Sequence, residues 1–216
     1  MVAIDEAFLK TWREKYQWPR YQSRESSERR IFGLEELIRR NVLNKGPMTV
    51  KDVLEEIVRW KTGGRFQAIN YFRRNDQKEV KKKIDVILKL LRREPKKVVK
   101  PIKRLTSLEG VKIAVASAFL RFMDPIEHKY GIIDKNVARF LNDQGTTHFI
   151  LRSNDDYIIY TSKNIEEYQN YNNWLRAKAA ELDLTTYKDI YGNEIKFNPV
   201  DVEMAIFAYK TQWKHF

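Results

Sequence analysis

One carboxylate, Asp134, is a candidate for chemistry because it lies at the start of a predicted helix. The stretch that begins there, Asp-Lys-Asn-Val-Ala-Arg-Phe-Leu, combines a typical N-cap residue with amphipathic spacing. As an N-cap, a carboxylate accepts hydrogen bonds from the free N–H groups of the first helical turn. Beside a reacting centre, it can orient or deprotonate water, or stabilise positive charge. The two roles can coexist, since one oxygen can cap the helix while the other faces a pocket.

A predicted helix-hairpin-helix, at about residues 105–123, precedes this acid. Small and apolar residues at helical spacing follow the turn. Gly110 permits a backbone turn that a larger residue would strain. The turn itself is formed by Leu108, Gly110, Val111 and Lys112.

This order of turn, small-residue helix and acid resembles the helix-hairpin-helix, Gly/Pro-Asp (HhH-GPD) superfamily of DNA base-excision glycosylases, which includes endonuclease III-like enzymes. The likeness runs from Leu105 to Asn142, with a weaker one from Asn198 to Phe207. It implies a mainly α fold of two helical subdomains and a hairpin whose backbone N–H groups bind DNA phosphates. It also implies that a damaged base is flipped into a pocket between the subdomains, with Asp134 as the catalytic acid.

Two positions depart from the superfamily pattern. Its hairpins usually read Leu-Pro-Gly-Val-Gly, and Lys112 stands here at the second glycine. A positive φ would strain Lys112, so we expect the turn to differ locally. Members that also cleave the strand carry a nucleophilic lysine two residues further on, where this chain has Ala114. The resemblance therefore implies a monofunctional N-glycosylase, a hydrolase in which water attacks and the strand stays intact.

Composition indicates a basic, folded protein. The 216 residues include 41 Lys and Arg against 29 Asp and Glu, a net charge of +12, which favours a polyanionic partner. With no cysteine, the chain has no disulfide, no thiolate metal site and none of the iron–sulfur cluster that some relatives carry. No apolar run approaches a membrane span, and the N-terminal stretch is too charged for a signal peptide. We expect a cytoplasmic, nucleoid-associated location, or a nuclear one in a eukaryote.

Positive charge is concentrated just before the hairpin. Residues 73–104 contain fourteen Lys and Arg and four acids, arranged around an apolar stripe that predicts an amphipathic helix. Such a charged face is usually only solvated. Its place beside the hairpin makes phosphate binding an equal alternative, with the helix and the hairpin gripping one DNA backbone. The candidate phosphate-binding lysines on this segment are Lys81, Lys82, Lys96 and Lys97.

Two adjacent glycines, Gly63 and Gly64, interrupt a predicted helix and are followed by polar and aromatic residues. Their simplest interpretation is a helix C-cap. In the glycosylase interpretation, a loop in this half of the chain approaches the minor groove. Gln67 or Asn70 could then fill the gap that a flipped base leaves.

We predict one mainly α domain over residues 1–216. A central subdomain would span 44–142, and a terminal subdomain would combine 1–43 with 143–216. Alternating β-rich runs around a polar turn predict a small β-hairpin insertion near 147–161. His148, in that insertion, is interpreted as structural rather than catalytic. No metal site or cofactor is expected, and a monovalent cation at the hairpin is left open.

Three hypotheses stay open. The first is a monomeric base-excision repair glycosylase that removes a damaged or mismatched base from double-stranded DNA. The second is a DNA-binding protein that keeps the hairpin but has lost its chemistry, an alternative suggested by Lys112 and Ala114. The third is a helical RNA-binding or protein-binding domain in which the hairpin is coincidental. The lesion is not specified by the sequence, because pocket shape decides it.

Overall fold

The computed structural model describes residues 2–17, 21–124, 127–152, 157–182 and 185–212, and these are mainly helical. This confirms the predicted mainly α class. The helices are α1 (Glu6–Glu14), α2 (Arg24–Ile38), the π-helical turn η1 (Arg39–Leu43), α3 (Val50–Thr62), α4 (Phe66–Arg73), α5 (Gln77–Arg93), α6 (Val99–Leu105), α7 (Ile113–Met123), α8 (Lys135–Asp143), α9 (Ser162–Glu181) and α10 (Pro199–Gln212).

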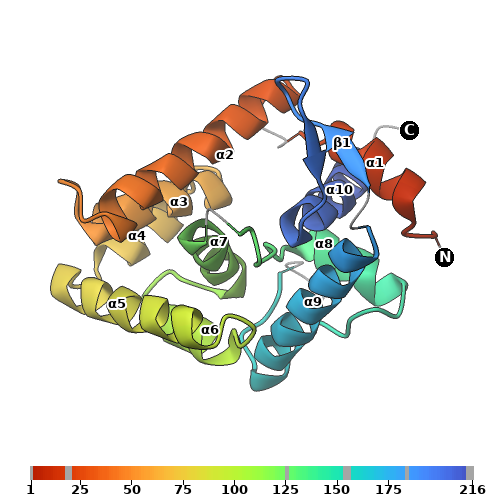
Figure 1. Ribbon diagram of the computed structural model, residues 1–216. Helices are drawn as coiled ribbons and strands as arrows, with labels where there is room; N and C mark the ends of the chain where they lie inside the picture. Colours follow the sequence, from red (N-terminus) through yellow and green to blue (C-terminus); the bar gives the residue numbers. More distant parts are fainter. Residues whose placement is uncertain (1, 18–20, 125–126, 153–156, 183–184, 213–216) are drawn as a thin grey trace.

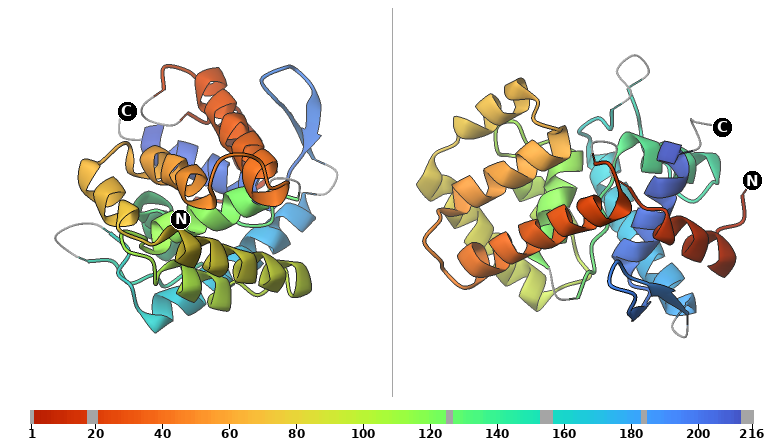
Figure 2. Two further views of the ribbon diagram at one scale, coloured as in Figure 1. Left: turned by 90° about the vertical axis from the view of Figure 1, so that its left-hand side faces the viewer. Right: turned by 90° about the horizontal axis from the view of Figure 1, so that it is seen from above.

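The helices form two groups that α2 connects (Figure 1). One group contains α3 to α7, and the other contains α1, α8, α9 and α10. The view from above in Figure 2 shows the same separation. α2 reaches both groups, since it packs against α3 and α7, and its Arg24 Nη2 donates to the carbonyl of Lys188 at 2.7 Å. The subdomain boundaries at 44–142 stay a prediction.

The β structure is small. Strands β1 (Thr186–Lys188) and β2 (Glu194–Lys196) pair antiparallel, a ribbon that the sequence analysis did not identify. Within the predicted hairpin at 147–161, an antiparallel bridge joins Leu151 to Ile158. The polar turn predicted at 153–156 lies outside the described residues. That insertion is therefore held by an isolated bridge, and the two-stranded sheet lies further along the chain.

A buried guanidinium fixes α10 against the N-terminal helices. Arg13 of α1 is 4% exposed, and its Nε donates to Asp201 Oδ1 at 2.8 Å. Its Nη1 donates to Glu28 Oε1 of α2, and its Nη2 to Tyr187 Oη at 3.2 Å. Burying charges is costly unless each is paired and hydrogen-bonded. The network therefore specifies one arrangement of α1, α2, β1 and α10.

The extended segment before α8 is bound along its length by α9. Tyr168 Oη donates to the carbonyl of Gly131 at 2.9 Å, and the Gly131 N–H donates to Asn172 Oδ1 at 3.1 Å. Tyr171 Oη donates to the carbonyl of Ile132 at 3.2 Å. Buried backbone groups outside regular structure need such partners. The aromatic face of α9 thus fixes the path that leads to Asp134.

Helix α7 holds the same segment from the other side. Ser117 Oγ accepts a hydrogen bond from the Ile133 N–H at 3.1 Å and donates to the carbonyl of Ala114 at 2.9 Å. Ser117 is fully buried. The helix that follows the hairpin is therefore tied directly to the residue before Asp134.

Gly131→Ala should destabilise the protein because a Cβ there would overlap Leu175 Cδ1 and lie 2.9 Å from Tyr171 Oη. Overpacking of this kind costs about 1–3 kcal/mol. The free energy of unfolding, measured by denaturant titration, should fall by that amount.

Gly33→Ala is the matched control, since nothing lies within 4 Å of a Cβ at this position in α2. It should raise the free energy of unfolding by roughly 0.5–1 kcal/mol, the usual gain from replacing a helical glycine by alanine. Equal effects of the two substitutions on the free energy of unfolding would contradict the close packing of Tyr171 and Leu175 against residue 131.

Candidate active site

The predicted hairpin turn is present and unstrained. Gly110 has φ 76°, the left-handed conformation that favours glycine. Lys112 is extended, with φ −92° and ψ 173°, and forms the N-cap of α7. Leu108 and Val111 are buried, and the Val111 N–H donates to the carbonyl of Leu108 at 3.2 Å. Lysine in place of the second glycine therefore creates no positive-φ strain.

The hairpin rests on α4 and on one asparagine. Asn75 Oδ1 accepts from the Glu109 N–H at 2.9 Å, and its Nδ2 donates to the Glu109 carbonyl at 3.0 Å. A Cβ on Gly110 would lie 2.9 Å from both Ala68 O and Phe72 N. The turn is thus pressed against the α4 backbone, and any larger residue at 110 would push the two apart.

The start of α7 has no side-chain cap on its first N–H groups. Uncapped N–H groups and the helix dipole together favour an anion at such an end. Lys83 of α5 lies beside this turn, with its Nζ 2.8 Å from Ser107 Oγ. The hairpin therefore has the backbone donors and one of the cations that phosphate binding requires.

The four predicted phosphate-binding lysines are all exposed, but they lie at opposite ends of α5. Lys81 and Lys82 are in its second turn, whereas Lys96 and Lys97 follow its C-terminus. A helix of 17 residues is about 25 Å long at 1.5 Å per residue. The first pair is thus on the same half of α5 as Lys83, and the second pair lies near α9, since Gln169 Nε2 donates to the carbonyl of Lys96 at 2.6 Å.

Of the two residues predicted to fill the gap left by a flipped base, Gln67 is exposed and Asn70 is half-buried, both on α4. The sequence analysis overlooked their neighbour Phe66, which is 74% exposed. This is the largest exposure among the large apolar side chains that the structure describes. Phe66 begins α4 two residues after Gly64, and the φ values of Gly63 and Gly64 are 64° and 75°. An apolar ring is thus presented to solvent at the end of a turn.

Asp134 caps α8 with one oxygen and meets a lysine with the other. Its Oδ1 accepts from the N–H groups of Asn136 at 2.9 Å and Val137 at 3.0 Å. Its Oδ2 lies 3.8 Å from the Nζ of Lys61, in the last turn of α3. The Lys61 side chain is 6% exposed and that of Asp134 is 17% exposed. The predicted N-cap is confirmed, and the second oxygen is left directed at a buried amine.

A second carboxyl group, Glu203 of α10, lies near Asp134 and Lys61, and these three side chains form a buried cluster. Burial, together with the charge of Asp134, raises its pKa to about 8, although Lys61 and Arg121 act in the opposite direction. The residue is 5% exposed. At neutral pH Glu203 is therefore mostly a neutral acid, able to donate a proton. Pairs of carboxyl groups in contrasting environments are typical of acid–base sites.

Arg121 connects this cluster to α2. Its Nη2 donates to Glu35 Oε1 at 2.6 Å, and His128 Nδ1 lies 3.8 Å from the same oxygen. Burial and the positive charge of Arg121 lower the pKa of His128, so the imidazole is neutral at pH 7. The three side chains hold α2, α7 and the segment after α7 around the buried cluster.

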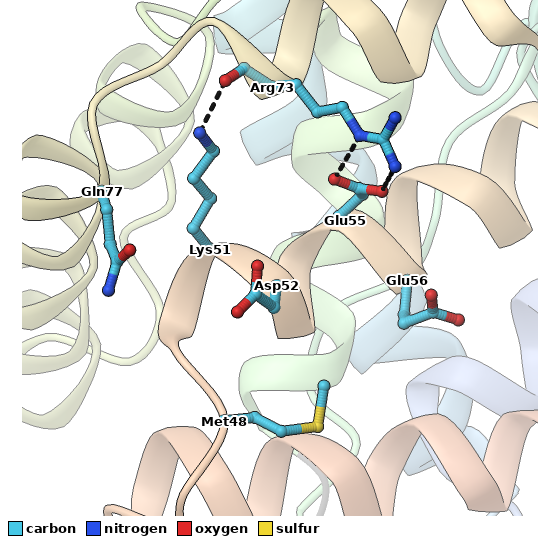
Figure 3. A pocket seen from close by; sticks show the side chains of 7 residues that line it. All are labelled: Met48, Lys51, Asp52, Glu55, Glu56, Arg73 and Gln77. Carbon is cyan, nitrogen blue, oxygen red and sulfur yellow. Dashed lines mark hydrogen bonds and ion pairs between the residues drawn. The ribbon is translucent and has the colours of Figure 1, made fainter.

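A hollow of about 420 Å³ lies elsewhere, around the start of α3 (Figure 3). Arg73 Nε and Nη2 donate to Glu55 at 2.9 and 2.8 Å, and Lys51 Nζ donates to the carbonyl of Arg73 at 2.6 Å. These contacts join α3 to α4, and none of the lining residues belongs to the buried cluster. The hollow is lined by Met48, Lys51, Asp52, Glu55, Glu56, Arg73 and Gln77.

Lys61 and Glu203 were both missed by sequence reasoning. A lysine in the last turn of a helix is common, because it suits the helix dipole, so Lys61 gives no signal by type. Glu203 does give one, as an acid within the otherwise apolar run from Val202 to Phe207. The side chain of His148 is exposed, and its backbone N–H donates to Glu167 Oε1 at 2.9 Å, so its interpretation as structural stays a prediction.

In the described part of the chain, no helix is long and apolar enough to cross a membrane. Across the same residues, no three His, Asp or Glu side chains gather where they could hold a metal ion.

One family model matches residues 6–207, and its description is "OGG: Putative 8-oxoguanine DNA glycosylase OGG-like protein". Neither the curated proteins nor the solved structures include a significant match. The family match extends over nearly the whole chain and includes the hairpin, Lys61, Asp134 and Glu203.

Glu203→Gln should stabilise the protein more at high pH than at low pH. The folded state retains the Glu203 proton up to a pKa of about 8, while the unfolded chain releases it near 4.5. The stability that protonated Glu203 contributes is therefore complete below pH 4.5 and is lost as pH rises toward 8. Glutamine does not titrate, so the Tm difference between the variant and the wild type should increase over this range. Exposed Glu194→Gln is the control, and a difference independent of pH for Glu203→Gln would contradict the assignment.

Proposed function

The chain belongs to the OGG-like family, and from this premise we propose that it is a DNA glycosylase that releases a damaged base from double-stranded DNA. The observation that carries the proposal is the Asp134 carboxylate, which caps α8 with Oδ1 and directs Oδ2 at the buried cluster. The family description makes 8-oxoguanine the first substrate to test.

Asp134 suits the charge change of this reaction. Breaking an N-glycosidic bond develops positive charge on the sugar, and a carboxylate beneath the ring stabilises that charge. The two backbone N–H groups on Oδ1 fix the orientation of the carboxylate before substrate arrives. Preorganisation of this kind removes the cost of reorienting the group during the reaction.

Ala114 led to the prediction that water is the nucleophile. Attack by water would leave an intact abasic strand. The absence of an amine at position 114 supports water, because Ala114 presents only a methyl group there. The position of Lys61, 3.8 Å from Asp134, provides a second possible nucleophile. Base release itself needs only one of the two.

The DNA surface that we propose combines the hairpin, the start of α7 and the adjacent half of α5. Uncapped N–H groups at α7 and the nearby Lys83 support phosphate binding there, and the net charge of +12 supports a polyanionic partner. Lys81 and Lys82 are close enough along α5 to extend this surface. Lys96 and Lys97, at the far end of α5, would contact DNA only if the duplex also reached α9.

Phe66 is the side chain that we propose to enter the duplex. Architectural and repair proteins insert apolar side chains between base pairs and thereby unstack them. Phe66 is 74% exposed, and it is only five residues from Lys61, so the chain limits their separation to about 17 Å. Gln67 and Asn70, on the same helix, remain candidates for contacts with the unpaired partner base.

An inactive DNA-binding protein is the second candidate. Ala114 favours it, whereas the unstrained Lys112 removes one of the two reasons for suspecting lost chemistry. An RNA-binding or protein-binding domain is the third. Base release across a panel of damaged bases, beginning with 8-oxoguanine, separates the first candidate from the other two. Preference for an abasic-analogue duplex over intact duplex then separates the second from the third.

Asp134→Asn should reduce single-turnover base release by at least ~100-fold, because the amide cannot stabilise positive charge as a carboxylate does. Asparagine is also an N-cap residue, so the cap of α8 should persist, although loss of the charge beside Lys61 should lower the Tm. Affinity for an abasic-analogue duplex should stay near that of the wild type.

Asp76→Asn is the matched control, because Asp76 caps α5 through the Glu79 N–H at 2.9 Å and lies outside the buried cluster. It should keep the cap of α5 and leave base release intact. Full activity of Asp134→Asn together with a lower Tm would assign Asp134 to capping alone.

Phe66→Ala should impair unstacking of the duplex without destabilising the protein. A 2-aminopurine placed beside the lesion should brighten on binding the wild type and stay quenched with the variant, because its neighbours remain stacked. The rate of base release should fall by about 10-fold or more, which corresponds to a loss of at least 1.4 kcal/mol of transition-state stabilisation.

Tyr191→Ala removes an aromatic ring of similar exposure, 61%, from the turn between β1 and β2. This control should affect neither signal. If Phe66→Ala also leaves the fluorescence change intact, the inserted residue lies elsewhere.

A further inference from the structure

A lysine amine close to the candidate catalytic carboxylate comes from α3 rather than from the hairpin. Lys61 Nζ lies 3.8 Å from Asp134 Oδ2, and α3 packs directly against α7, the helix that carries Ala114. Helix α3 therefore brings an amine to the carboxylate that the first turn of α7 does not supply.

We propose that Lys61 is the nucleophile that attacks the sugar, in place of water, and that the protein forms a covalent Schiff base with DNA. This inference rests on the proposed glycosylase function. It assigns Lys61 the attacking group and Asp134 the base that accepts its proton.

The position of Lys61 is costly for a residue with only a structural role. Lysine is almost never fully buried unless it is paired, and its side chain here is 6% exposed. A buried ion pair is weak evidence for stability, because desolvation offsets much of the attraction between the charges. Lys61 lies beside Asp134, a carboxylate that can accept a proton, and near Glu203, a neutral acid that can donate one. This combination of groups is typical of acid–base sites.

Two other lysines are near Asp134 in the sequence or at the hairpin, and neither has this environment. Lys112 is exposed, and its Nζ lies 4.2 Å from the centre of the Tyr157 ring. Lys135 follows Asp134 directly, but its side chain is exposed. Of these three lysines, only Lys61 combines burial with a contact to the second oxygen of Asp134.

The reaction is balanced without an additional reagent. Asp134 first takes one proton from the Lys61 ammonium, and this proton passes to the departing base. The Nζ lone pair thus freed forms a bond to C1′ while the C1′–N bond breaks, and the bonding electrons leave with the base. Asp134 accepts one proton from the attached nitrogen. The C1′–O4′ bond then opens, O4′ takes the proton from Asp134, and the nitrogen lone pair forms the iminium.

The iminium has two fates. Addition of water returns the amine and leaves an abasic strand. Loss of a C2′ proton instead expels the 3′ phosphate and cleaves the strand. Strand cleavage is thus a possible consequence of the Lys61 route but not a required one, so the covalent intermediate is the diagnostic species.

The test is reduction with borohydride in the presence of two duplexes, one with 8-oxoguanine opposite cytosine and one with a preformed abasic site. The wild type should give a protein–DNA adduct with both, and peptide mass spectrometry should locate it at Lys61. Lys61→Arg keeps the charge beside Asp134 but cannot form an imine. It should lose the adduct by at least ~100-fold while retaining a cooperative thermal transition and the affinity for an abasic-analogue duplex.

Lys135→Arg is the matched control, and it should form the adduct as the wild type does. An adduct located at a different lysine would overturn the assignment, as would undiminished trapping by Lys61→Arg. Base release by the wild type without any adduct would show that water attacks, and would also overturn it.

Failure of the proposed function gives a different result. If no lesion duplex releases a base, the abasic duplex still tests the amine. An adduct at Lys61 on that substrate would support the nucleophile while refuting the glycosylase. No adduct on either duplex would overturn the inference, and base release would then decide the proposed function separately.

Discussion

The arrangement of the candidate active site depends on two contacts of one carboxylate, one for each of its oxygens. Asp134 Oδ1 is held by two backbone N–H groups at the start of α8, and Oδ2 is thereby directed at Lys61 of α3. α8 packs against α10, and α3 packs against α7, so this contact joins the two groups of helices. A carboxylate fixed in this way cannot rotate away from the amine without losing its cap.

The rest of the molecule positions that carboxylate. Tyr168, Tyr171 and Asn172 of α9 bind the backbone just before Asp134, and Ser117 of α7 binds the next N–H along. On the far side, the Arg13 network orients α10 and hence Glu203. The buried polar groups in these networks have specific partners, which favours one packing of the core over alternatives.

The sequence predicted what local patterns encode. A glycine in the predicted turn indicated the left-handed conformation at Gly110, and an acid before an amphipathic helix indicated the Asp134 cap. Helical periodicity indicated the mainly α fold. The structure confirms all three. It could not predict Lys61, because its contact with Asp134 joins residues 73 positions apart through the packing of α3. The β1–β2 ribbon was missed because each strand has only three residues. The four candidate phosphate-binding lysines were predicted from the local concentration of charge. The length of α5 separates Lys81 and Lys82 from Lys96 and Lys97.

The most direct measurement is a crystal structure of the protein bound to a duplex with a non-cleavable analogue of the damaged nucleotide. We predict that the flipped sugar lies between α3 and α8, with C1′ within about 3.5 Å of both Lys61 Nζ and Asp134 Oδ2, the separation needed for attack. A sugar bound elsewhere, with the contact between Lys61 and Asp134 undisturbed, would contradict it.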